Sequence, residues 1–330
     1  MTRTNGTAIK IALVGIGKIA RDQHIPALAA SDAFELAATV SRTGGIRGVE
    51  NYKTVEALLA ARPDISAISF CTPPQVRYAG ARAALDAERH VMLEKPPGPS
   101  LSEVHALETV AQDNGVALFA TWHSRHAASV PAAKAWLSDK TIISVRIDWK
   151  EDVRVWHPGQ KWIWEAGGLG IFDPTINAFS ILTEILPVEV HVTGADLRFP
   201  INCETPVAGE IRMDGPSGPL VIAEVDFLWE GDPLWRQIVE TDGGTLALNQ
   251  GGAVMEIDGQ KQQHGEAWEN PAIHGEYDGL YARFAELLDT NTSEVDLRPM
   301  VLVADAFTLA KRFDAPEFVD PSLMEDSHAG

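Results

Sequence analysis

The sequence predicts an α/β fold, with an N-terminal doubly wound parallel sheet and a C-terminal α+β part that has a large, mostly antiparallel open sheet. Two observations predict it. From Ile9 to about Arg125, short apolar runs alternate with amphipathic stretches, whereas from about Ile142 strand-like runs follow one another between Gly-rich turns. The length of 330 residues suits two domains at about 150 residues each. We therefore expect one domain over residues 1–125 and a second over residues 126–330.

The elements of the first domain alternate in type along the chain. Continuous apolar strands joined by helical crossovers are typical of a parallel sheet covered on both faces. The segments are, in chain order, IKIALVGI, the helix from Gly17 to Ala30, FELAATVS, VEALLAAR, ISAISFCT, VRYAGARAALDA, HVMLEK, LSEVHALETVAQDNG and ALFATWH.

The second domain begins with a strand of regular alternation. In IISVRIDWK, the apolar residues Ile143, Val145, Ile147 and Trp149 alternate with polar ones, which indicates a strand with one solvated face. Further strand-like runs are VEVHVTG, VAGEIRM, LVIAEVDFLW, RQIVETD, GTLALNQ and AVMEI, and helical patterns cover residues 171–186, 276–288 and 299–312. From about Asp314 the chain is acidic and contains prolines, so we expect a loosely held end.

The composition is that of an acidic globular chain. Lys and Arg number 27 against 46 Asp and Glu, and this formal net charge of −19 argues against a broad basic face for nucleic acid. With 45% hydrophobic and 22% charged residues the chain can bury a sizeable core. No apolar run approaches the roughly 20 residues of a membrane helix, and the N-terminus lacks the order of a secretory signal. We expect a cytoplasmic protein without nucleic-acid or membrane partners.

The two cysteines, Cys71 and Cys203, are too few for a disulfide scaffold or a four-cysteine zinc site. We expect two reduced, buried thiols, with a single disulfide bridge as the alternative.

A phosphate-binding motif follows the first apolar strand. The sequence Gly15-Ile16-Gly17-Lys18-Ile19-Ala20 is a G-x-G-x-x-A that opens a helix. The first glycine makes the tight turn, the second lets the backbone approach a pyrophosphate, and the alanine permits close packing of helix on strand. This context predicts a Rossmann dinucleotide-binding domain in which Gly15, Gly17, Lys18 and Ile19 contact the cofactor. The alternative is that the glycines only turn a corner.

The end of the next strand indicates which dinucleotide is preferred. An NAD-specific enzyme usually carries Asp or Glu there for the ribose 2′-hydroxyl, but this chain has Ser41 and Arg42. A guanidinium fork and a hydroxyl suit a 2′-phosphate. We therefore expect NADP to be preferred, with NAD possible. Alternatively, Arg42 lies on the adenine or is a solvated charge.

Three further strand ends carry polar residues, and ligands of open parallel sheets lie beyond these ends. Thr72 and Pro73 follow ISAISF, Glu94 and Lys95 follow HVML, and His123 follows ALFA. We assign the first four to the cofactor site. A desolvated Lys ammonium can polarise an oxygen or exchange a proton, so Lys95 is also a catalytic candidate. Its structural alternative is a salt bridge between Lys95 and Glu94.

The chain resembles the glucose-fructose oxidoreductase, inositol dehydrogenase and rhizopine catabolism (Gfo/Idh/MocA) family over about Ile9 to Ser180. The motifs that carry this resemblance are GIGKIA, CTPP, EKP and GGLGIFDPTIN. Within it, ARDQHIPAL, HVMLEKPPG, FATWHSR and WKEDVRVWHPGQKWIWE look most like bacterial aldose 1-dehydrogenases acting on L-arabinose and D-galactose. The resemblance implies hydride transfer from C1 of a sugar to the cofactor, an aldonolactone product, and a homodimer or homotetramer formed through one face of the second sheet.

The family's second catalytic segment commonly reads GG, then Asp, then His four residues on, where this chain has Asp173 and Asn177. At this spacing both side chains share a helix face. Asn in place of His moves the proton transfer to Asp173 or Lys95, and the sequence leaves open which of them is the base. A helix cap at Asp173, followed by Pro174, is the structural alternative.

The segment from Trp149 to Glu165 holds four of the chain's nine tryptophans together with acids and a histidine. Sugar CH faces pack on indoles, and carboxylates and imidazoles bind hydroxyls. We expect Glu151, Trp156, His157, Asp173 and Asn177 to bind the substrate. His123 joins them from the first domain. The H-x-x-H of His123 and His126 lacks a third ligand, so we expect no metal.

The leading hypothesis is an NAD(P)-dependent aldose 1-dehydrogenase. The alternatives are a non-catalytic cofactor or sugar sensor of the same fold, and a related oxidoreductase acting on another polyol.

Overall fold

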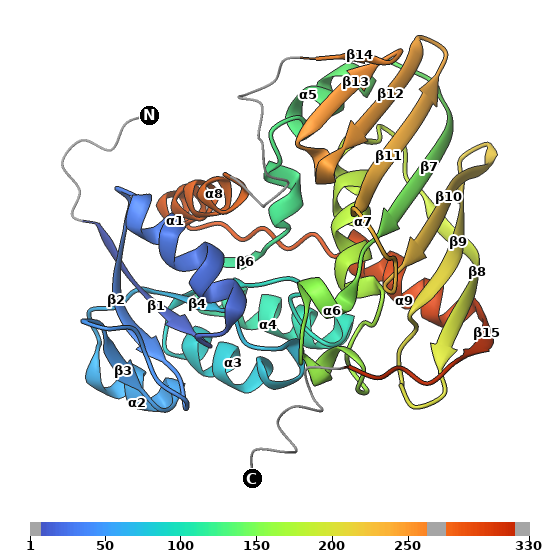
Figure 1. Ribbon diagram of the computed structural model, residues 1–330. Coiled ribbons are helices and arrows are strands. Elements are labelled where there is room, and N and C mark those ends of the chain that lie inside the picture. The colour runs from blue at the N-terminus through green and yellow to red at the C-terminus, as the bar shows by residue number, and fades with distance from the viewer. Residues whose placement is uncertain (1–7, 263–274, 321–330) are drawn as a thin grey trace. The chain divides into compact units, whose positions relative to one another are not determined.

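The computed structural model describes residues 8–262 and 275–320. Two compact units are present: Met1–His123 with Ile273–Leu297, and Ser124–Ala272 with Arg298–Gly330. The first unit contains a parallel sheet and the second a larger mixed sheet (Figure 1). This confirms the predicted fold class.

The sheet of the first unit has six parallel strands in the order β3-β2-β1-β4-β5-β6. The strand order reverses direction between β1 and β4, and such a switch point is where open parallel sheets bind ligands. The strands are β1 Ile9–Val14, β2 Phe34–Val40, β3 Glu50–Tyr52, β4 Ala67–Phe70, β5 His90–Leu93 and β6 Leu118–Ala120.

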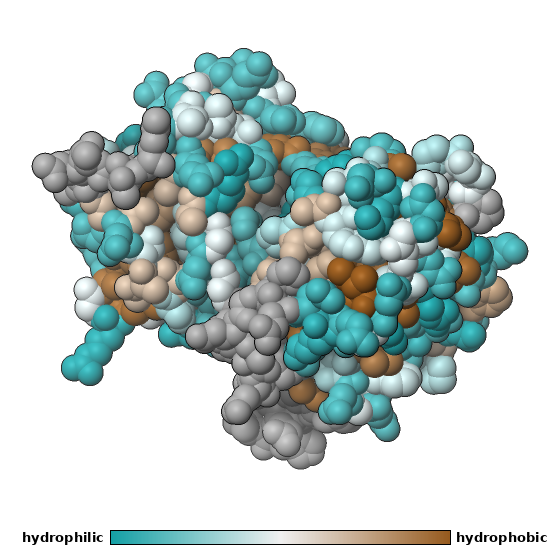
Figure 2. Space-filling model, turned by 90° about the horizontal axis from the view of Figure 1, so that it is seen from above, coloured by the Kyte–Doolittle hydropathy of each residue, from teal (hydrophilic) through white to brown (hydrophobic). Residues whose placement is uncertain are grey.

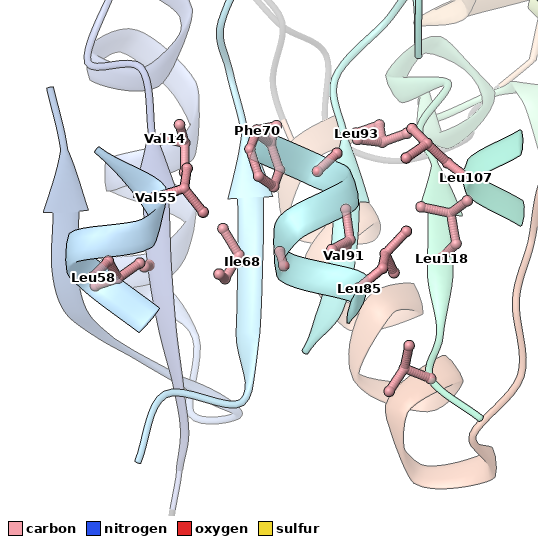
Figure 3. Close-up of a cluster of buried hydrophobic side chains, with 14 of the residues drawn as sticks. Val14, Val55, Leu58, Ile68, Phe70, Leu85, Val91, Leu93, Leu107 and Leu118 are labelled. Atoms are coloured by element: carbon pink, nitrogen blue, oxygen red, sulfur yellow. The ribbon is translucent and has the colours of Figure 1, made fainter. Parts of the chain in front are cut away.

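Helices cover both faces of this sheet. The helical segments are η1 Ala20–His24, α1 Ile25–Ala30, α2 Val55–Ala61, η2 Pro74–Val76, α3 Tyr78–Asp86, α4 Leu101–Asp113 and α8 Glu276–Thr290. The short segment η3 His123–His126 begins at the last residue of the first stretch of this unit. Side chains of α2, α3 and α4, such as Leu58, Leu85 and Leu107, meet strand residues such as Ile68 and Val91 in one apolar layer (Figure 3). Because the strands are buried on both faces, their sequences are continuously apolar rather than alternating.

Helix α8 belongs to the first unit although it follows most of the second unit in sequence. Its Tyr281 and Phe284 rings pack at 5.6 and 5.8 Å from the ring of Phe34 on β2. Helices α1 and α8 lie side by side (Figure 1) and share an apolar cluster on the face of the sheet opposite α2 and α3. The two predicted domains, residues 1–125 and 126–330, do not account for this return of the chain to the first unit.

The sheet of the second unit has nine strands in the order β14-β13-β12-β11-β7-β10-β9-β8-β15. All neighbours are antiparallel except β7 with β10 and β8 with β15. The strands are β7 Ile142–Lys150, β8 His191–Pro200, β9 Ala208–Gly215, β10 Gly218–Asp226, β11 Leu234–Thr241, β12 Gly244–Asn249, β13 Val254–Ile257, β14 Gln260–Lys261 and β15 Ala310–Ala315. The helical segments are α5 Val130–Leu137, α6 Val153–Trp156, η4 Lys161–Ile163, α7 Phe172–Ile185, η5 Gln250–Gly252 and α9 Arg298–Leu309.

Strand β7 confirms the predicted alternation with one exception. Val145, Ile147 and Trp149 are buried, but Ile143 is 57% exposed. The register between β7 and β11 shifts between Glu240 and Thr241, so Ile143 has no residue opposite it on β11. An irregularity of this kind redirects side chains locally. The prediction that Ile143 shares the buried face is therefore wrong.

The predicted C-terminal helix is too long. Helix α9 ends at Leu309, and β15 then pairs in parallel with β8, from Ala310 opposite Ala195. The guanidinium of Arg312 lies 4.0 Å from the ring centroid of Phe199. The prediction that the helix continues to Arg312 is therefore wrong. The prediction of a loosely held segment from Asp314 is wrong for Asp314 and Ala315, which belong to β15. In both cases the pairing of β15 with β8 overrides local propensity. The last ten residues, 321–330, lie outside the described residues.

Both cysteines are free thiols, which confirms the reduced state. Cys71 is buried, but Cys203 is only half-buried, so the expectation of two buried thiols is wrong for Cys203. None of the helices in the described ranges is long and apolar enough to cross a membrane. Hydrophilic residues predominate on the face drawn in Figure 2, and hydrophobic ones occur between them in small groups.

Candidate active site

The turn after β1 has the geometry of a phosphate-binding loop. Gly15 has a φ of +88°, and a Cβ there would lie 2.7 Å from Thr72 Cγ2 and 2.9 Å from the Thr72 nitrogen. Only glycine fits such a position. At Gly17 a Cβ would meet nothing within 4 Å, so this exposed backbone faces open space. Ala20 is fully buried beneath the turn. These residues fit the pyrophosphate of a dinucleotide.

Lys18 and Ile19 lie at the start of the helix that follows. The ammonium of Lys18 forms an ion pair with Asp22, one helical turn later, and the Lys18 side chain is 60% exposed. Ile19 is half-buried and packs against the apolar cluster shared with α1.

The loop after β2 carries the residues expected near the adenosine ribose. Ser41 is 8% exposed and its carbonyl accepts a hydrogen bond from Asn51 Nδ2 at 3.1 Å, whereas Arg42 is exposed. Lys53 Nζ donates to the Arg42 carbonyl at 3.0 Å. A second cation, which sequence spacing alone did not indicate, therefore lies beside Arg42.

The Glu94 carboxylate holds the turn that carries Lys95. Glu94 Oε2 accepts a hydrogen bond from the Lys95 backbone nitrogen at 2.6 Å. Glu94 Oε1 accepts from the Tyr277 hydroxyl at 2.6 Å and lies 3.2 Å from His24 Nε2. The Glu94 carboxylate thus contacts the Lys95 turn through the backbone nitrogen of Lys95.

Glu94 and His24 are a buried charged pair. Burial by itself raises the pKa of Glu94, but hydrogen bonds and charge from His24, the charge of His123 and the hydrogen bond from Tyr277 lower it to about 2. Burial lowers the pKa of His24, yet Cys71, Tyr281 and Glu94 outweigh it and raise that pKa well above its ordinary value. Both shifts favour the charged forms of the pair, imidazolium and carboxylate.

His123 is buried at the carboxyl end of β6. Its Nδ1 lies 2.5 Å from Glu276 Oε2, and its ring stacks on that of Tyr277 at 5.4 Å between centroids. Glu276 and Tyr277 are the first two residues of α8. Helix α8 therefore supplies residues that position two strand ends of the sheet.

In the second unit the structure brings together three of the predicted substrate residues. His157 Nε2 lies 3.5 Å from Glu151 Oε1, and His157 Nδ1 lies 3.7 Å from Asp173 Oδ2. Both acids are nearly fully buried, whereas the imidazole is 21% exposed. One accessible imidazole thus stands between two buried carboxylates, an arrangement that can exchange protons and bind hydroxyl groups.

Each member of this cluster is placed by a different element. Glu151 follows β7, His157 follows α6, and Asp173 lies in the first turn of α7. Asp152 starts α6 as its N-cap, accepting from the Arg154 nitrogen at 2.9 Å. The local turn that carries His157 is therefore fixed by a side chain directly after Glu151.

Asp173 is not a helix cap. The N-cap position of α7 belongs to Ile171, with no side-chain hydrogen bond, and Asp173 is the second helical residue. A carboxylate in a first turn is favoured by the helix dipole. Asn177 follows one turn later on the same helix, and it is half-buried where the residues on either side are buried. The capping alternative is wrong.

Aromatic residues surround Glu151. Trp235 Nε1 donates to Glu151 Oε2 at 2.7 Å, and the Trp235 ring lies 5.0 Å from Trp156 and 6.4 Å from Trp149. Trp149 is 3% exposed and belongs to the core, whereas Trp156 and Trp235 are half-buried. Trp235 was not singled out from the sequence because it lies 84 residues from Glu151.

Groups of three or more His, Cys, Asp or Glu side chains suited to a metal ion are absent from the described ranges.

The comparisons with known proteins identify the family of this chain. The model of the oxidoreductase family GFO_IDH_MocA, with an NAD-binding Rossmann fold, matches residues 9–121. A galactose 1-dehydrogenase of Pseudomonas fluorescens is 43% identical over 324 residues, covering 94% of this chain and 99% of that protein.

Solved structures give the same result over both units. A D-galactose-1-dehydrogenase from Rhizobium etli has 49% sequence identity and a TM-score of 0.90, covering 96% of this chain and all of the other. A 3-ketoreductase from Actinomadura kijaniata shares the fold at 22% identity, with a TM-score of 0.77 over 94% of this chain and all of the other. The chain belongs to the Gfo/Idh/MocA family and is an NAD(P)-dependent oxidoreductase with a Rossmann fold.

Proposed function

We propose that this protein is an NADP-preferring aldose 1-dehydrogenase that oxidises L-arabinose and D-galactose at C1 to the aldonolactone. The observation that carries the proposal is the likeness to two galactose 1-dehydrogenases along nearly the whole chain, at 43% and 49% identity. These matches cover 94% and 96% of this chain.

The cluster in the second unit supports a sugar substrate. Two buried carboxylates and a partly exposed imidazole offer acceptors and a donor for adjacent hydroxyls, with the Asn177 amide one turn from Asp173. Trp156 and Trp235 offer indole faces for the CH groups of a pyranose. His123 is the residue of the first unit that we assign to the substrate.

The bound nicotinamide would accept the C1 hydride, and the side chains of this chain position the sugar and handle the proton. We assign the proton of the C1 hydroxyl to Asp173 or Lys95. If Lys95 stays protonated, its ammonium stabilises the negative charge that develops on O1, and Asp173 is the base.

The preference for NADP rests on the loop after β2. Arg42 is exposed, Lys53 lies beside its carbonyl, and Ser41 adds a hydroxyl. Two cations and a hydroxyl suit a 2′-phosphate, and a charge-assisted hydrogen bond contributes about 1.5 to 3 kcal/mol. We propose NAD as a weaker second cofactor. Gly15, Gly17, Lys18, Ile19, Thr72 and Pro73 complete the proposed cofactor contacts.

We further propose that the enzyme is a homodimer or homotetramer, which light scattering would test. The alternatives are a non-catalytic sensor and a family member acting on another polyol. Absorbance at 340 nm separates the first of these, because a sensor binds cofactor and sugar without reducing the cofactor.

The test is kcat/KM for NADP reduction with five sugars, and identification of a lactone product. L-Arabinose and D-galactose share their configuration at C2, C3 and C4, so a pocket that binds these hydroxyls accepts both. D-Glucose, D-mannose and D-xylose should be poor, since an inverted or mismatched hydroxyl leaves a buried polar group unpaired at about 1 to 3 kcal/mol. A higher kcat/KM for D-glucose or for a non-sugar alcohol would overturn the assignment.

A further inference from the structure

Arg77 is a buried cation with no role in the chemistry proposed above. It lies between η2 and α3, in the sequence PPQVRYA, and is only 2% exposed. Burial lowers the pKa of its guanidinium to about 10, so it remains charged at neutral pH. A buried cation costs free energy unless its donors are satisfied. Its partners therefore indicate why it is there.

Those partners are backbone carbonyls on both sides of Lys95. Nη1 donates to the Glu94 carbonyl and, at 2.5 Å, to the Pro96 carbonyl. Since Nη1 carries two hydrogens, it can serve both acceptors at once. One terminal nitrogen of Arg77 thus holds the residues immediately before and after Lys95.

The other terminal nitrogen holds the neighbouring turn. Arg77 Nη2 donates to the Thr72 carbonyl at 2.5 Å, directly after β4. Thr72 in turn lies against Gly15, where a Cβ would come within 2.9 Å of the Thr72 nitrogen. The Lys95 turn, Arg77, the Thr72 turn and the Gly15 turn therefore form one continuous series of contacts.

The Glu94 carboxylate acts on Arg77 only through its charge, which raises the pKa of the guanidinium against the larger lowering by burial. Over the described ranges, Arg77 makes its hydrogen bonds to three carbonyl oxygens and forms no ion pair. The planar guanidinium fork can address acceptors on two turns, which the compact ammonium of a lysine cannot do with the same geometry.

We propose that Arg77 is a positioning residue for Lys95: it ties the Lys95 turn to the Thr72 turn and so fixes the Lys95 ammonium relative to the cofactor turn. The inference rests on the proposed function in that Lys95 acts at the reacting carbon. A displacement of about 1 Å in such a group can cost about a hundredfold in rate.

The test compares Arg77→Met and Arg77→Lys with the control Arg82→Met. Arg82 lies on α3, the helix that begins directly after Arg77, but it is exposed and forms an i,i+4 pair with Asp86. For Arg77→Met we expect kcat with NADP and D-galactose to fall about 10- to 100-fold, with KM and the NADP Kd within about threefold. The deuterium isotope effect on kcat with C1-deuterated sugar should rise, because misplacement slows hydride transfer itself. Arg77→Lys should be intermediate and Arg82→Met unchanged.

Loss of folded enzyme alone would lower the apparent kcat but leave the isotope effect unchanged, and this result would overturn the proposal. So would a kcat within twofold of wild type in a folded Arg77→Met protein. If Arg77→Met does not fold, the same measurements are made on Arg77→Lys.

Hydrogen exchange tests the contacts of Arg77 without substrate. In Arg77→Lys, the backbone amides of residues 71–76 and 93–98 should exchange faster than in wild type, while those of β7 to β13 should exchange at the wild-type rate. Unchanged exchange rates would contradict the proposal for Arg77, whatever the activity of the wild type. A wild type that oxidises none of the sugars would instead refute the proposed function.

Discussion

His24 Nε2 lies 3.2 Å from Glu94 Oε1, and the two residues are 0% and 3% exposed. The other Glu94 oxygen accepts from the backbone nitrogen of Lys95. The charge state of this buried pair therefore acts on the turn that carries Lys95. His24 also lies 2.8 Å from the Tyr281 hydroxyl through Nδ1, which fixes the orientation of its ring.

Thermal stability should depend on pH through this pair. The pKa of Glu94 is lowered from 4.5 to about 2, so its contribution is present above pH 4.5 and is lost as pH falls toward 2. The pKa of His24 is raised above 6.5, so its contribution is complete below 6.5 and is lost as pH rises through the folded-state value. Calorimetric melting temperatures from pH 3 to 9.5 would show a decline at both ends.

Replacing Glu94 by Gln should flatten both declines. Removing one partner of a buried ion pair costs about 3 to 5 kcal/mol, because the remaining charge is left uncompensated. The matched control is Glu108→Gln, whose partner His105 is exposed. A Glu94→Gln protein with the wild-type pH profile would show that the pair does not govern stability.

Lys95→Met should lower turnover about 10²- to 10⁴-fold, the range for loss of a proton-transfer group, while the NADP Kd stays within a few fold. We propose that Lys95 acts at the reacting carbon rather than on the pyrophosphate. Steady-state kinetics and cofactor fluorescence titration measure the two quantities. Lys134→Met, which removes an exposed lysine paired with Glu184, serves as the control. Near-wild-type turnover would remove Lys95 from the chemistry.

Asp173→Asn should lower turnover by a similar factor, because the amide cannot accept a proton. The stability change should be small by comparison, with about 1 kcal/mol from the helix dipole, since Asp173 does not cap α7 and the isosteric amide keeps its place beside His157. Parallel kinetics and melting curves decide this, with the exposed Asp139→Asn as the control. Retained turnover with a lowered melting temperature would indicate a purely structural Asp173.

The double change Ser41→Asp with Arg42→Ser should weaken NADP about tenfold or more and leave NAD equal or better. A carboxylate repels the 2′-phosphate and accepts a hydrogen bond from the 2′-hydroxyl of NAD. Lys53→Met alone should weaken NADP by a smaller factor, because Lys53 is the neighbouring cation. Kd values for both cofactors test this, and an unchanged preference would place the discriminating residues elsewhere.

Much of the fold could be predicted because its signals are local. The continuous apolar strands of the first unit and the alternation in β7 depend on residues close in sequence, and periods of 2 and 3.6 residues follow from backbone geometry. The same holds for Gly15, whose positive φ follows from a turn between a strand and a helix. The proximity of Glu151, His157 and Asp173 was also expected, since they lie within 23 residues of one another.

Only the tertiary structure decided the contacts between distant segments. Sequence patterns did not place Tyr281 on His24, 257 residues away, or Trp235 on Glu151. They also gave β15 the appearance of a helix end, because its pairing with β8 depends on which strand lies at the edge of the sheet. Arg77 is the sharpest example: one arginine in a helix-forming segment becomes a link between two strand ends. The physical reason is that local periodicity determines which face of an element is buried, whereas the packing of whole elements determines what that face meets.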